Sequence, residues 1–514
     1  MSVLTGKHLI DGQWCAQSCE SFSAYAPQMD EFISPQFHSA GAAEVNLAVQ
    51  AAERGFEVIR QLSDHRRSEL LTNIAQQLEY IRTPLVARCV RETGLPTGRV
   101  NGEIDRTKKQ LLHFASLLME GNWRRACSAS SDVTSHPDLQ LSSVPLGPVV
   151  VFSASNFPLA FSVAGGDTAS ALAAGCSVIV KAHPAHPGTS EMVADCILSA
   201  LKHLDIPPCV FSLLQSKDHE AGVALVTNPA VKAAGFTGSI QGGRALFDIV
   251  SQRPEPIPFF GELGSTNPVF VFDSTFANGV DAFAQAFLSS MTQGAGQFCT
   301  SPGILVLQKS EHLDTLLTSL AAAIPSQAKQ TMLTPHICSA YRRATKQRQS
   351  RSELNTLAVG RVAENAQSQA HIALFSVSAQ DYLSNPELEH EVFGPSTLIV
   401  ICQDFAEQLE VAKSLREHLA SSVFSGPDTE DRQQIAQLVD ALSLKVGRLV
   451  FNGFATGVEI SPAMQHGGPY PSSTIAAITS VGSRAIERFM RPVCFQSMPV
   501  DYLPVVLTSA TADQ

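Results

Sequence analysis

In the first part of the chain, the spacing of apolar residues predicts helices. Two runs have apolar residues three or four positions apart, which is the spacing of one face of a helix. These runs are Val45, Val49, Ala52, Phe56 and Ile59, and then Leu71, Ile74, Leu78 and Ile81. They predict two amphipathic helices. Before them, His8 to Trp14 predicts a hairpin, because its Asp11-Gly12 pair favours a tight turn between strands.

From Pro148 onward, short apolar runs alternate with segments of helical character. The runs predict buried strands at 149–152, 177–180, 210–214 and 231–236. The intervening segments predict helices that end near Ala171 or cover 190–204, 222–226 and 243–250. This alternation is typical of an α/β fold with a doubly wound parallel sheet, joined by right-handed crossovers. Such sheets bind ligands beyond the carboxyl ends of their strands.

A second α/β region is expected from about Gly261 to Gly468, with strands at 269–272, 304–307, 398–401 and 449–452. The polar run from Cys127 to Asp138 predicts a loop, and Leu139 to Val144 predicts a strand that crosses between domains. The last stretch, Pro492 to Leu507, predicts either an edge strand that pairs with another subunit or an unstructured tail.

Length and charge narrow the class of protein. At 514 residues the chain is too long for one core, so two or three domains are expected. Hydrophobic residues make up 44% and charged residues 16%, which indicates a globular protein. The net charge of −11 disfavours a nucleic-acid partner, and scattered Lys and Arg disfavour binding to a membrane surface.

Cysteine usage and the N-terminus predict a cytoplasmic location. The eleven cysteines are an odd number and show no disulfide framework, which fits reduced thiols. Residues 1–8 lack the pattern of a signal peptide. The stretch from Leu146 to Gly166 carries no charge, but Pro148, Asn156 and Pro158 interrupt it. It therefore predicts a strand, a turn and a helix start, and not a membrane span.

A thiol and a carboxylate stand out, each beside glycines. Cys299 follows Gly294-Ala295-Gly296-Gln297-Phe298, and Glu262 lies between Gly261 and Leu263-Gly264. A deprotonated thiol is a good nucleophile, and a buried carboxylate can act as a general base near neutral pH. Each residue alone is more often a buried structural cysteine or a solvated glutamate.

Other segments at strand ends carry polar groups with weaker signals. The strand-to-helix turn that contains Gly238 and Ser239 could bring backbone N–H groups to a phosphate, or could be only a tight turn. Asn156 could donate to an oxyanion, or could only form a turn before Phe157-Pro158. Lys181 could meet a ribose or a phosphate, or be solvated. Glu391 could hold a ribose diol, or be an exposed loop acid.

A metal site is not expected. His183 and His186 are separated by a proline, and the sequence offers no third ligand beside them.

Taken in order, six segments resemble the NAD(P)-dependent aldehyde dehydrogenase superfamily over nearly the whole chain. They are Asn156-Phe157-Pro158, Lys181, Phe236-Thr237-Gly238-Ser239, Glu262-Leu263-Gly264, Gly296-Gln297-Phe298-Cys299 and Glu391-Val392-Phe393-Gly394-Pro395. Longer stretches, such as 165–175, 185–190, 253–258 and 466–471, are similar to the bacterial α-ketoglutaric semialdehyde (2,5-dioxovalerate) dehydrogenase group. A bacterial NADP-dependent fatty aldehyde dehydrogenase is also similar to that group.

The resemblance implies a role for each matched residue. Cys299 would attack the aldehyde, Asn156 would stabilise the oxyanion, and Glu262 would activate the hydrolytic water. The cofactor would be held by Lys181, Gly238, Ser239, Glu391 and Phe393, and Phe157 would line the substrate tunnel.

The resemblance also implies the cofactor. Relatives that prefer NAD often carry a glutamate three residues after the lysine, whereas this chain has Pro184 there. No carboxylate would repel a 2′-phosphate, so NADP is expected to be preferred and NAD to be used as well. NADP-specific relatives place a hydroxyl at that position and an arginine near the position of His219, and this chain has neither.

The implied domains are a Rossmann-like cofactor domain at 1–138 and 148–260, and a catalytic domain at 261–475. An oligomerisation arm with a C-terminal tail would comprise 139–147 and 476–514. A homodimer or homotetramer is expected.

The expected reaction is oxidation of α-ketoglutaric semialdehyde to 2-oxoglutarate. A medium- or long-chain aldehyde is the alternative substrate. A CoA-acylating dehydrogenase is disfavoured by Glu262, and a silent scaffold by the intact set of Cys299, Glu262 and Asn156.

Overall fold

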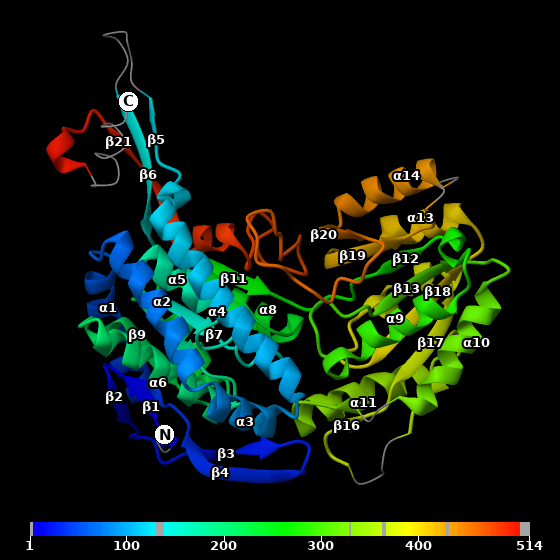
Figure 1. The fold of residues 1–514 in the computed structure, drawn as a ribbon, viewed down its shortest axis with the longest axis horizontal. Helices are drawn as coiled ribbons and strands as arrows, with labels where there is room; N and C mark the ends of the chain where they lie inside the picture. Colours follow the sequence, from blue (N-terminus) through cyan, green and yellow to red (C-terminus); the bar gives the residue numbers. More distant parts are fainter. Residues whose placement is uncertain (1–3, 130–137, 328–329, 362–365, 428–430, 504–514) are drawn as a thin grey trace.

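Two seven-stranded sheets lie side by side, and a smaller three-stranded sheet projects from the molecule (Figure 1). The computed structural model describes residues 4–129, 138–327, 330–361, 366–427 and 431–503. The two large sheets confirm the expected α/β class.

The first sheet has the order β11-β10-β7-β8-β9-β1-β2. Its strands are β1 (His8–Ile10), β2 (Gln13–Cys15), β7 (Val149–Phe152), β8 (Val178–Lys181), β9 (Phe211–Leu214), β10 (Ala233–Thr237) and β11 (Phe259–Glu262). The five strands from β11 to β9 are parallel, and the hairpin β1–β2 continues the sheet antiparallel. The predicted hairpin and parallel strands are thus confirmed.

Helices cover both faces of this sheet because alternate strand residues point in opposite directions. Val149 and Val151 pack into the cluster that includes α2, α4, α5 and α6, whereas Val150 and Phe152 pack into the cluster that includes α1, α7 and α8. The helices are α1 (Ala42–Ile59), α2 (Asp64–Tyr80), α3 (Arg82–Thr93), α4 (Thr97–Glu120), α5 (Gly166–Ala174), α6 (Pro187–His203), α7 (Glu220–Thr227) and α8 (Ile240–Ser251). The six predicted helices are confirmed.

The first segment holds more structure than its sequence analysis predicted. Helices α3 and α4 follow the two expected helices, and a second hairpin forms from β3 (Ser21–Ala26) and β4 (Glu31–His38). In α4, Val100, Ile104 and Leu111 share one buried face, but Glu103 lies buried among them. A buried charged residue makes this helical period harder to recognise.

The second sheet has the order β15-β17-β18-β13-β12-β19-β20. Its strands are β12 (Val269–Val271), β13 (Ile304–Gln308), β15 (Asn355–Val359), β17 (Ala373–Ser378), β18 (Ser396–Cys402), β19 (His418–Phe424) and β20 (Val446–Phe451). All neighbours are parallel except β15 with β17. The four expected strands are present, but β20 begins three residues before the predicted Leu449.

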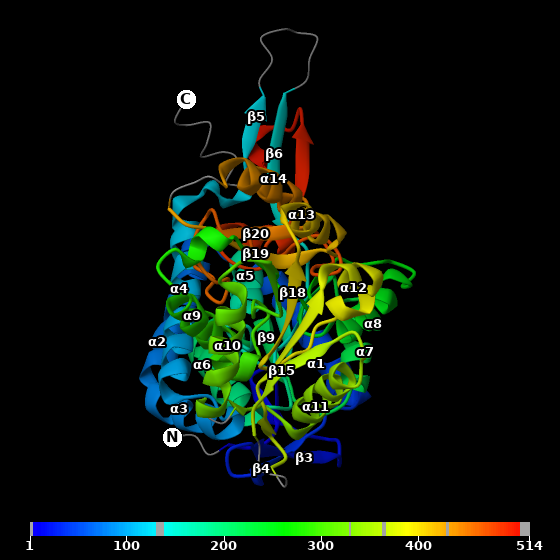
Figure 2. The same cartoon turned by 90° about the vertical axis from the view of Figure 1, so that its right-hand side faces the viewer.

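Helices again cover both faces of the second sheet (Figure 2). Leu305 and Leu307 face α9 (Asp281–Thr292) and α10 (Leu313–Ala323). Ile304 and Val306 belong to the cluster on the opposite face. The helices of that face are α12 (Ala379–Ser384), α13 (Phe405–Ser414) and α14 (Arg432–Ser443). Below the sheet lie α11 (Pro335–Gln349) and a short pair of strands, β14 (Gln330–Thr331) and β16 (Gln369–Ala370).

The projecting sheet corrects one prediction, the loop at 127–138, and contains two of the predicted strands. Its strands are β5 (Cys127–Ala129), β6 (Leu139–Pro145) and β21 (Met490–Gln496), with β6 in the centre (Figure 1). Cys127–Ala129 is therefore strand and not loop; residues 130–137 of that predicted loop lie outside the described part. The predicted crossing strand belongs to this sheet, and β21 pairs with β6 of the same chain along seven residue pairs. The final residues of the predicted tail, 504–507, also lie outside the described part.

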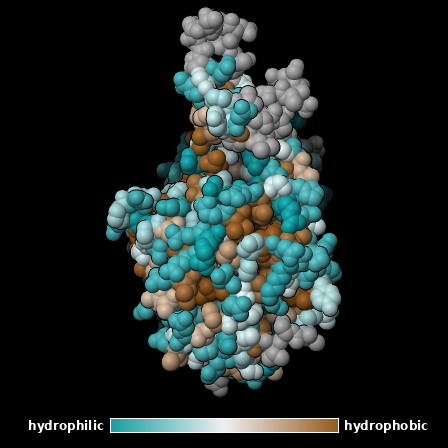
Figure 3. Space-filling model, turned by 90° about the vertical axis from the view of Figure 1, so that its left-hand side faces the viewer, coloured by the Kyte–Doolittle hydropathy of each residue, from teal (hydrophilic) through white to brown (hydrophobic). Residues whose placement is uncertain are grey.

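The uncharged stretch from Leu146 to Gly166 forms β7, a series of turns and the start of α5, as predicted. Among the described residues, no helix has the length and apolar character to cross a membrane. The face seen in Figure 3 is mainly hydrophilic, with hydrophobic patches in between and below the projecting sheet.

Candidate active site

Most of the predicted site residues follow the carboxyl ends of adjacent parallel strands. Lys181 ends β8, Glu262 ends β11, and Asn156 follows β7 by four residues. Ser239 caps the N-terminus of α8 directly after β10. Parallel strands end at one edge of a sheet, so these residues come together there.

Cys299 reaches this edge from the other sheet, on a backbone turn after α9. Gly294, Ala295 and Gly296 have φ values of 57°, 58° and 66°, so three consecutive residues are left-handed. A Cβ on Gly296 would lie 2.3 Å from the carbonyl carbon of Gly394, so the turn requires glycine at this position.

The side-chain amide of Asn267 holds the loop that carries Cys299. Asn267 Nδ2 donates to the carbonyl oxygens of Cys299 at 2.8 Å and Ser301 at 3.0 Å. Asn267 lies five residues after Glu262, so one short segment carries the carboxylate and holds the thiol loop.

Cys299, His466 and Glu262 lie in contact. Cys299 Sγ is 3.7 Å from His466 Nε2, and that nitrogen is 3.4 Å from Glu262 Oε2. Glu262 is 6% exposed and neither of its oxygens accepts a hydrogen bond from the described residues. A buried carboxyl group without donors favours its neutral form.

Burial shifts the pKa values of all three groups. It raises the pKa of Glu262 to about 8. Burial, together with the charges of Glu262 and Glu391, raises the pKa of Cys299 to about 12. Burial, with the charges of Arg448 and Arg106, lowers the pKa of His466 to about 3, so the imidazole is neutral. The carboxyl group is therefore the one of the three that titrates near neutral pH.

Asn156 and Phe157 contact the loop that carries the thiol. Asn156 Nδ2 donates to the carbonyl oxygen of Gln297 at 2.9 Å, two residues before Cys299. The rings of Phe157 and Phe298 meet edge to face with centroids 5.1 Å apart. Cys299 packs beside this aromatic cluster, so the thiol has an apolar wall.

Glu391 approaches the same region from the segment before β18. A Cβ on Gly264 would lie 2.2 Å from Glu391 Oε2, so the carboxylate lies directly against the Gly264 backbone. Burial raises the pKa of Glu391 to about 7, partly offset by the donated N–H of Ser265. Phe393 is partly exposed two residues further on.

A lysine and an exposed helix N-terminus also lie at this edge of the first sheet. Lys181 Nζ donates to the carbonyl oxygen of Ser216 at 3.0 Å, and burial lowers its pKa to about 8. Gly238 and Ser239 are exposed at the start of α8, and the Ser239 hydroxyl accepts from Gly242 N at 3.2 Å. An exposed helix N-terminus and a lysine suit the phosphates and ribose of a nicotinamide dinucleotide.

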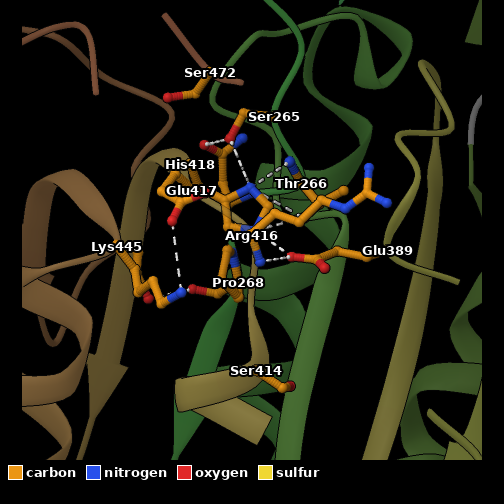
Figure 4. Close-up of polar contacts among 12 residues, drawn as sticks. Ser265, Thr266, Pro268, Glu389, Ser414, Arg416, Glu417, His418, Lys445 and Ser472 are labelled. Atoms are coloured by element: carbon orange, nitrogen blue, oxygen red, sulfur yellow. Dashed lines mark hydrogen bonds and ion pairs between the residues drawn. The ribbon is translucent and has the colours of Figure 1, made fainter. Parts of the chain in front are cut away.

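A buried polar network holds the segment between Glu262 and Asn267 in place (Figure 4). His418 Nε2 donates to Glu389 Oε1 at 2.9 Å, and Arg416 N donates to the same oxygen at 2.7 Å. On the other side of the ring, Thr266 N lies 3.4 Å from His418 Nδ1. Ser265 Oγ donates to Asn267 Oδ1 at 2.8 Å. The network thereby links the second sheet to the loop that carries the thiol.

The two histidines considered as metal ligands have other partners. His186 Nε2 donates to the carbonyl oxygen of Ala154 at 2.8 Å, and its Nδ1 lies 3.2 Å from Ser190 Oγ. The His183 ring stacks on it with centroids 5.8 Å apart. Within the described ranges, no three His, Cys, Asp or Glu side chains are grouped closely enough to hold a metal ion.

His466 is the site residue that the sequence analysis did not assign. The sequence showed it only within the stretch 466–471, as part of a resemblance. It lies 167 residues after Cys299, so no local spacing connects the two. Its backbone is fixed by the Thr479 hydroxyl, which accepts from His466 N at 2.9 Å.

Comparisons with known proteins agree with this arrangement. A model of the aldehyde dehydrogenase family matches residues 14–492. "Alpha-ketoglutaric semialdehyde dehydrogenase 2" of Azospirillum brasilense is 44% identical over 98% of this chain and 96% of that protein. "Alpha-ketoglutaric semialdehyde dehydrogenase" of Acinetobacter baylyi is 39% identical over 99% of this chain and 96% of that protein.

Solved structures share the fold at lower identity. A betaine aldehyde dehydrogenase variant from Staphylococcus aureus, solved with NAD+, has a TM-score of 0.84 and 19% identity, over 98% of this chain and 100% of that chain. An NADP-dependent enzyme of E. coli has a TM-score of 0.82 and 21% identity, over 96% and 98%. These two likenesses establish the fold.

Proposed function

Because this chain belongs to the aldehyde dehydrogenase family, we propose that it oxidises α-ketoglutaric semialdehyde to 2-oxoglutarate through a thioester on Cys299. The observation that carries the proposal is the contact of Cys299, His466 and Glu262 beside Asn156. The substrate is supported by the two relatives that match nearly the full length of the chain.

The first step forms a carbon–sulfur bond. The Cys299 thiolate attacks the aldehyde carbon, and the carbonyl electron pair moves onto oxygen. Asn156 Nδ2–H and the backbone N–H of Cys299 donate to that oxyanion. Because the Cys299 pKa is raised to about 12, the thiol needs a proton acceptor, and the Glu262 carboxylate, which contacts the same imidazole as the thiol, would provide one.

NAD(P)+ held at the sheet edge would supply the hydride acceptor, so that the carbon attached to sulfur would be oxidised to a thioester. Glu262 then takes a proton from water as the water oxygen attacks the thioester carbon. The carbon–sulfur bond breaks, the sulfur leaves as thiolate, and the product departs as a carboxylate. Glu262 is suited to this step because burial raises its pKa to about 8.

The residues at the sheet edge fit the cofactor. Gly238 and Ser239 would face the pyrophosphate at the exposed N-terminus of α8, and Lys181 would hold the adenosine ribose. Glu391, with Phe393 nearby, would hold the nicotinamide ribose. Burial raises the pKa of Glu391 to about 7, and hydrogen bonds from the ribose hydroxyls would favour its ionised form.

A modest preference for NADP over NAD is proposed from Pro184. This residue stands three positions after Lys181 and places no carboxylate beside a 2′-phosphate. Comparing kcat/KM for the two cofactors decides the preference, and a higher value with NAD would refute it.

Three further assignments belong to the same proposal. The cofactor domain comprises 1–138 and 148–260, the catalytic domain 261–475, and the arm 139–147 with 476–514. The arm would join subunits into a homodimer or homotetramer, since it projects and exposes Met498 and Tyr502 (Figure 1). A cytoplasmic location is supported by the cysteines, all eleven of which are described and free of disulfides.

The test mixes purified protein, α-ketoglutaric semialdehyde and NADP, with and without CoA, and follows nicotinamide absorbance and the product. Formation of 2-oxoglutarate at a rate independent of CoA is expected. Accumulation of an acyl-CoA, or no turnover of this semialdehyde, would overturn the proposal.

A further inference from the structure

Two arginines from different parts of the chain converge on one loop beside the active site. Arg106, on α4, donates from Nη1 to the carbonyl oxygen of Val458 at 2.7 Å. Arg448, on β20, donates from Nη1 to the carbonyl oxygen of Gly457 at 2.6 Å and from Nη2 to that of Ala455. One segment of loop therefore fixes both guanidinium groups.

Both guanidinium groups lie near enough to Cys299 to interact with its charge. The Arg106 guanidinium lies over the Phe161 ring, 5.6 Å from its centroid. The Phe161 ring is in turn 6.1 Å from the His466 ring and packs beside the cluster that contacts Cys299. Burial lowers the pKa of Arg106 and of Arg448, whereas the charge of a Cys299 thiolate raises both.

Neither arginine forms an ion pair within the described residues, although acidic residues lie close to Arg106. Glu103, one turn earlier on α4, pairs with Arg99 at 2.8 Å and accepts from the N–H groups of Leu159 and Ala160. Glu459, next to Val458 in the loop, pairs with Lys109. The neighbouring carboxylates are thus already engaged.

The Arg106 guanidinium also keeps donors free. An arginine offers five N–H donors, and Arg106 uses only Nη1 toward a described acceptor. Its side chain is partly buried, and Nε and Nη2 have no hydrogen-bond acceptor among the described residues. A planar guanidinium with free donors is suited to a carboxylate, which it can bind through two parallel hydrogen bonds.

We propose that Arg106 and Arg448 form the subsite that binds the distal carboxylate of the substrate while its aldehyde end lies at Cys299. The proposal rests on the proposed function, because only an aldehyde with an acid group at its other end uses such a subsite. Arg106 makes the direct contact, and Arg448 adds positive charge from the opposite sheet. Two fixed cations select a charged semialdehyde over an uncharged aldehyde of equal length.

The first experiment compares two substrates in the wild type and in Arg106→Met. We expect kcat/KM for α-ketoglutaric semialdehyde to fall about 10- to 100-fold, mainly through KM, since a hydrogen-bonded charge is lost. With pentanal, which lacks the acid group, kcat/KM is expected to change less than about threefold. Unchanged pentanal turnover also shows that the variant is folded.

Two further variants distinguish loss of the Arg106 charge from a general disturbance of the helix. Arg106→Lys keeps the cation and is expected to recover part of the lost semialdehyde activity. Lys108→Met removes another cation from the same helix, one that pairs with Glu79 of α2, and is expected to leave both substrates unaffected. Equal losses with both substrates in Arg106→Met and Arg448→Met would overturn the subsite.

A binding measurement distinguishes failure of the subsite from failure of the proposed function. Glutarate, a dicarboxylate without an aldehyde, is tested as an inhibitor that competes with pentanal. We expect the inhibition constant to rise about 10- to 100-fold in Arg106→Met and in Arg448→Met. Absence of competition in the wild type, or an unchanged constant in both variants, overturns the subsite. Failure of the wild type to oxidise the semialdehyde, with glutarate competition intact, refutes only the proposed substrate.

Discussion

At the scale of single residues, the site depends on a carboxyl group that is buried without donors. Glu262 ends β11 and lies against His466, and neither of its oxygens has a hydrogen-bond donor among the described residues. The same placement that makes the group a useful base also makes its charged form costly.

Glu262→Gln is expected to separate the two halves of the reaction. The amide cannot accept a proton from water, so kcat should fall by about 10²- to 10⁴-fold. Thioester formation should be affected less, because Cys299 and Asn156 are retained. Rapid mixing should show a burst of reduced cofactor followed by a slow steady rate. Turnover at the wild-type rate would remove Glu262 from its role.

The pH dependence of kcat provides a second check on the same group. A carboxyl group with a pKa raised to about 8 is protonated at lower pH, and only its ionised form can act as a base. The rate should therefore increase as pH rises through about 8. Asn156→Ala is the control, since it should lower the rate by about 10²- to 10³-fold and keep the same profile. A wild-type profile that stays flat through this range would contradict the assignment.

Sequence and structure agree unevenly at this scale. Cys299, Glu262 and Asn156 could be selected only because their segments, taken in order with three others, resemble one family, and the structure brings them together. Their roles stay predictions. His466 and Arg106 could not be assigned, because His466 contacts Cys299 and Arg106 contacts Phe161 only through the approach of distant parts of the chain.

At the scale of elements, the N-terminus of α8 has a structural role as a capped helix end, and a role in cofactor binding is proposed for it. Ser239 caps this helix and is exposed where the cofactor would lie. Ser239→Ala should cost about 1 kcal/mol of stability through the lost cap. It should also raise KM for NADP, whereas KM for the aldehyde should change little. Thermal unfolding and initial rates measure the two effects, and an unchanged KM for NADP would leave Ser239 only its capping role.

The network around His418 supports the loops of the site from the second sheet (Figure 4). His418→Leu leaves the buried Glu389 carboxylate with the N–H of Arg416 as its donor among the described residues. It should cost about 1–3 kcal/mol in the free energy of unfolding. Lys445→Met, which removes a partly exposed ion pair with Glu417 at 3.6 Å, should cost less than about 1 kcal/mol. Urea denaturation of both variants tests the difference, and equal costs would show that the network does not support the loop.

The elements themselves were predictable where one physical signal dominated. Strands buried on both faces, such as β7, read as continuous apolar runs, and α1 and α2 show a clear helical period. β5 was predicted as loop because three residues of strand, Cys127–Ala129, carry too little pattern. Its partner β6 stabilises it, and that pairing is not visible from local sequence.

At the scale of the whole molecule, the projecting sheet is the surface through which subunits are proposed to meet. Tyr502 is 75% exposed and Met498 is 40% exposed beyond β21. Tyr502→Asp combined with Met498→Asp should weaken association, since burying an unpaired charge is unfavourable. Light scattering after gel filtration measures the mass, and circular dichroism shows whether the fold is retained. An oligomer of unchanged mass would place the interface elsewhere.

Only residues 263–268 separate the end of β11 in the first sheet from the start of β12 in the second. This connection begins directly after Glu262. Asn267, near its other end, donates a hydrogen bond to the backbone of Cys299. A small rotation of one sheet against the other would therefore misalign base and nucleophile at once. Enzyme activity should therefore decrease when the relative orientation of the two sheets changes even slightly. It should be lost in mild denaturant before circular dichroism registers any melting of either half.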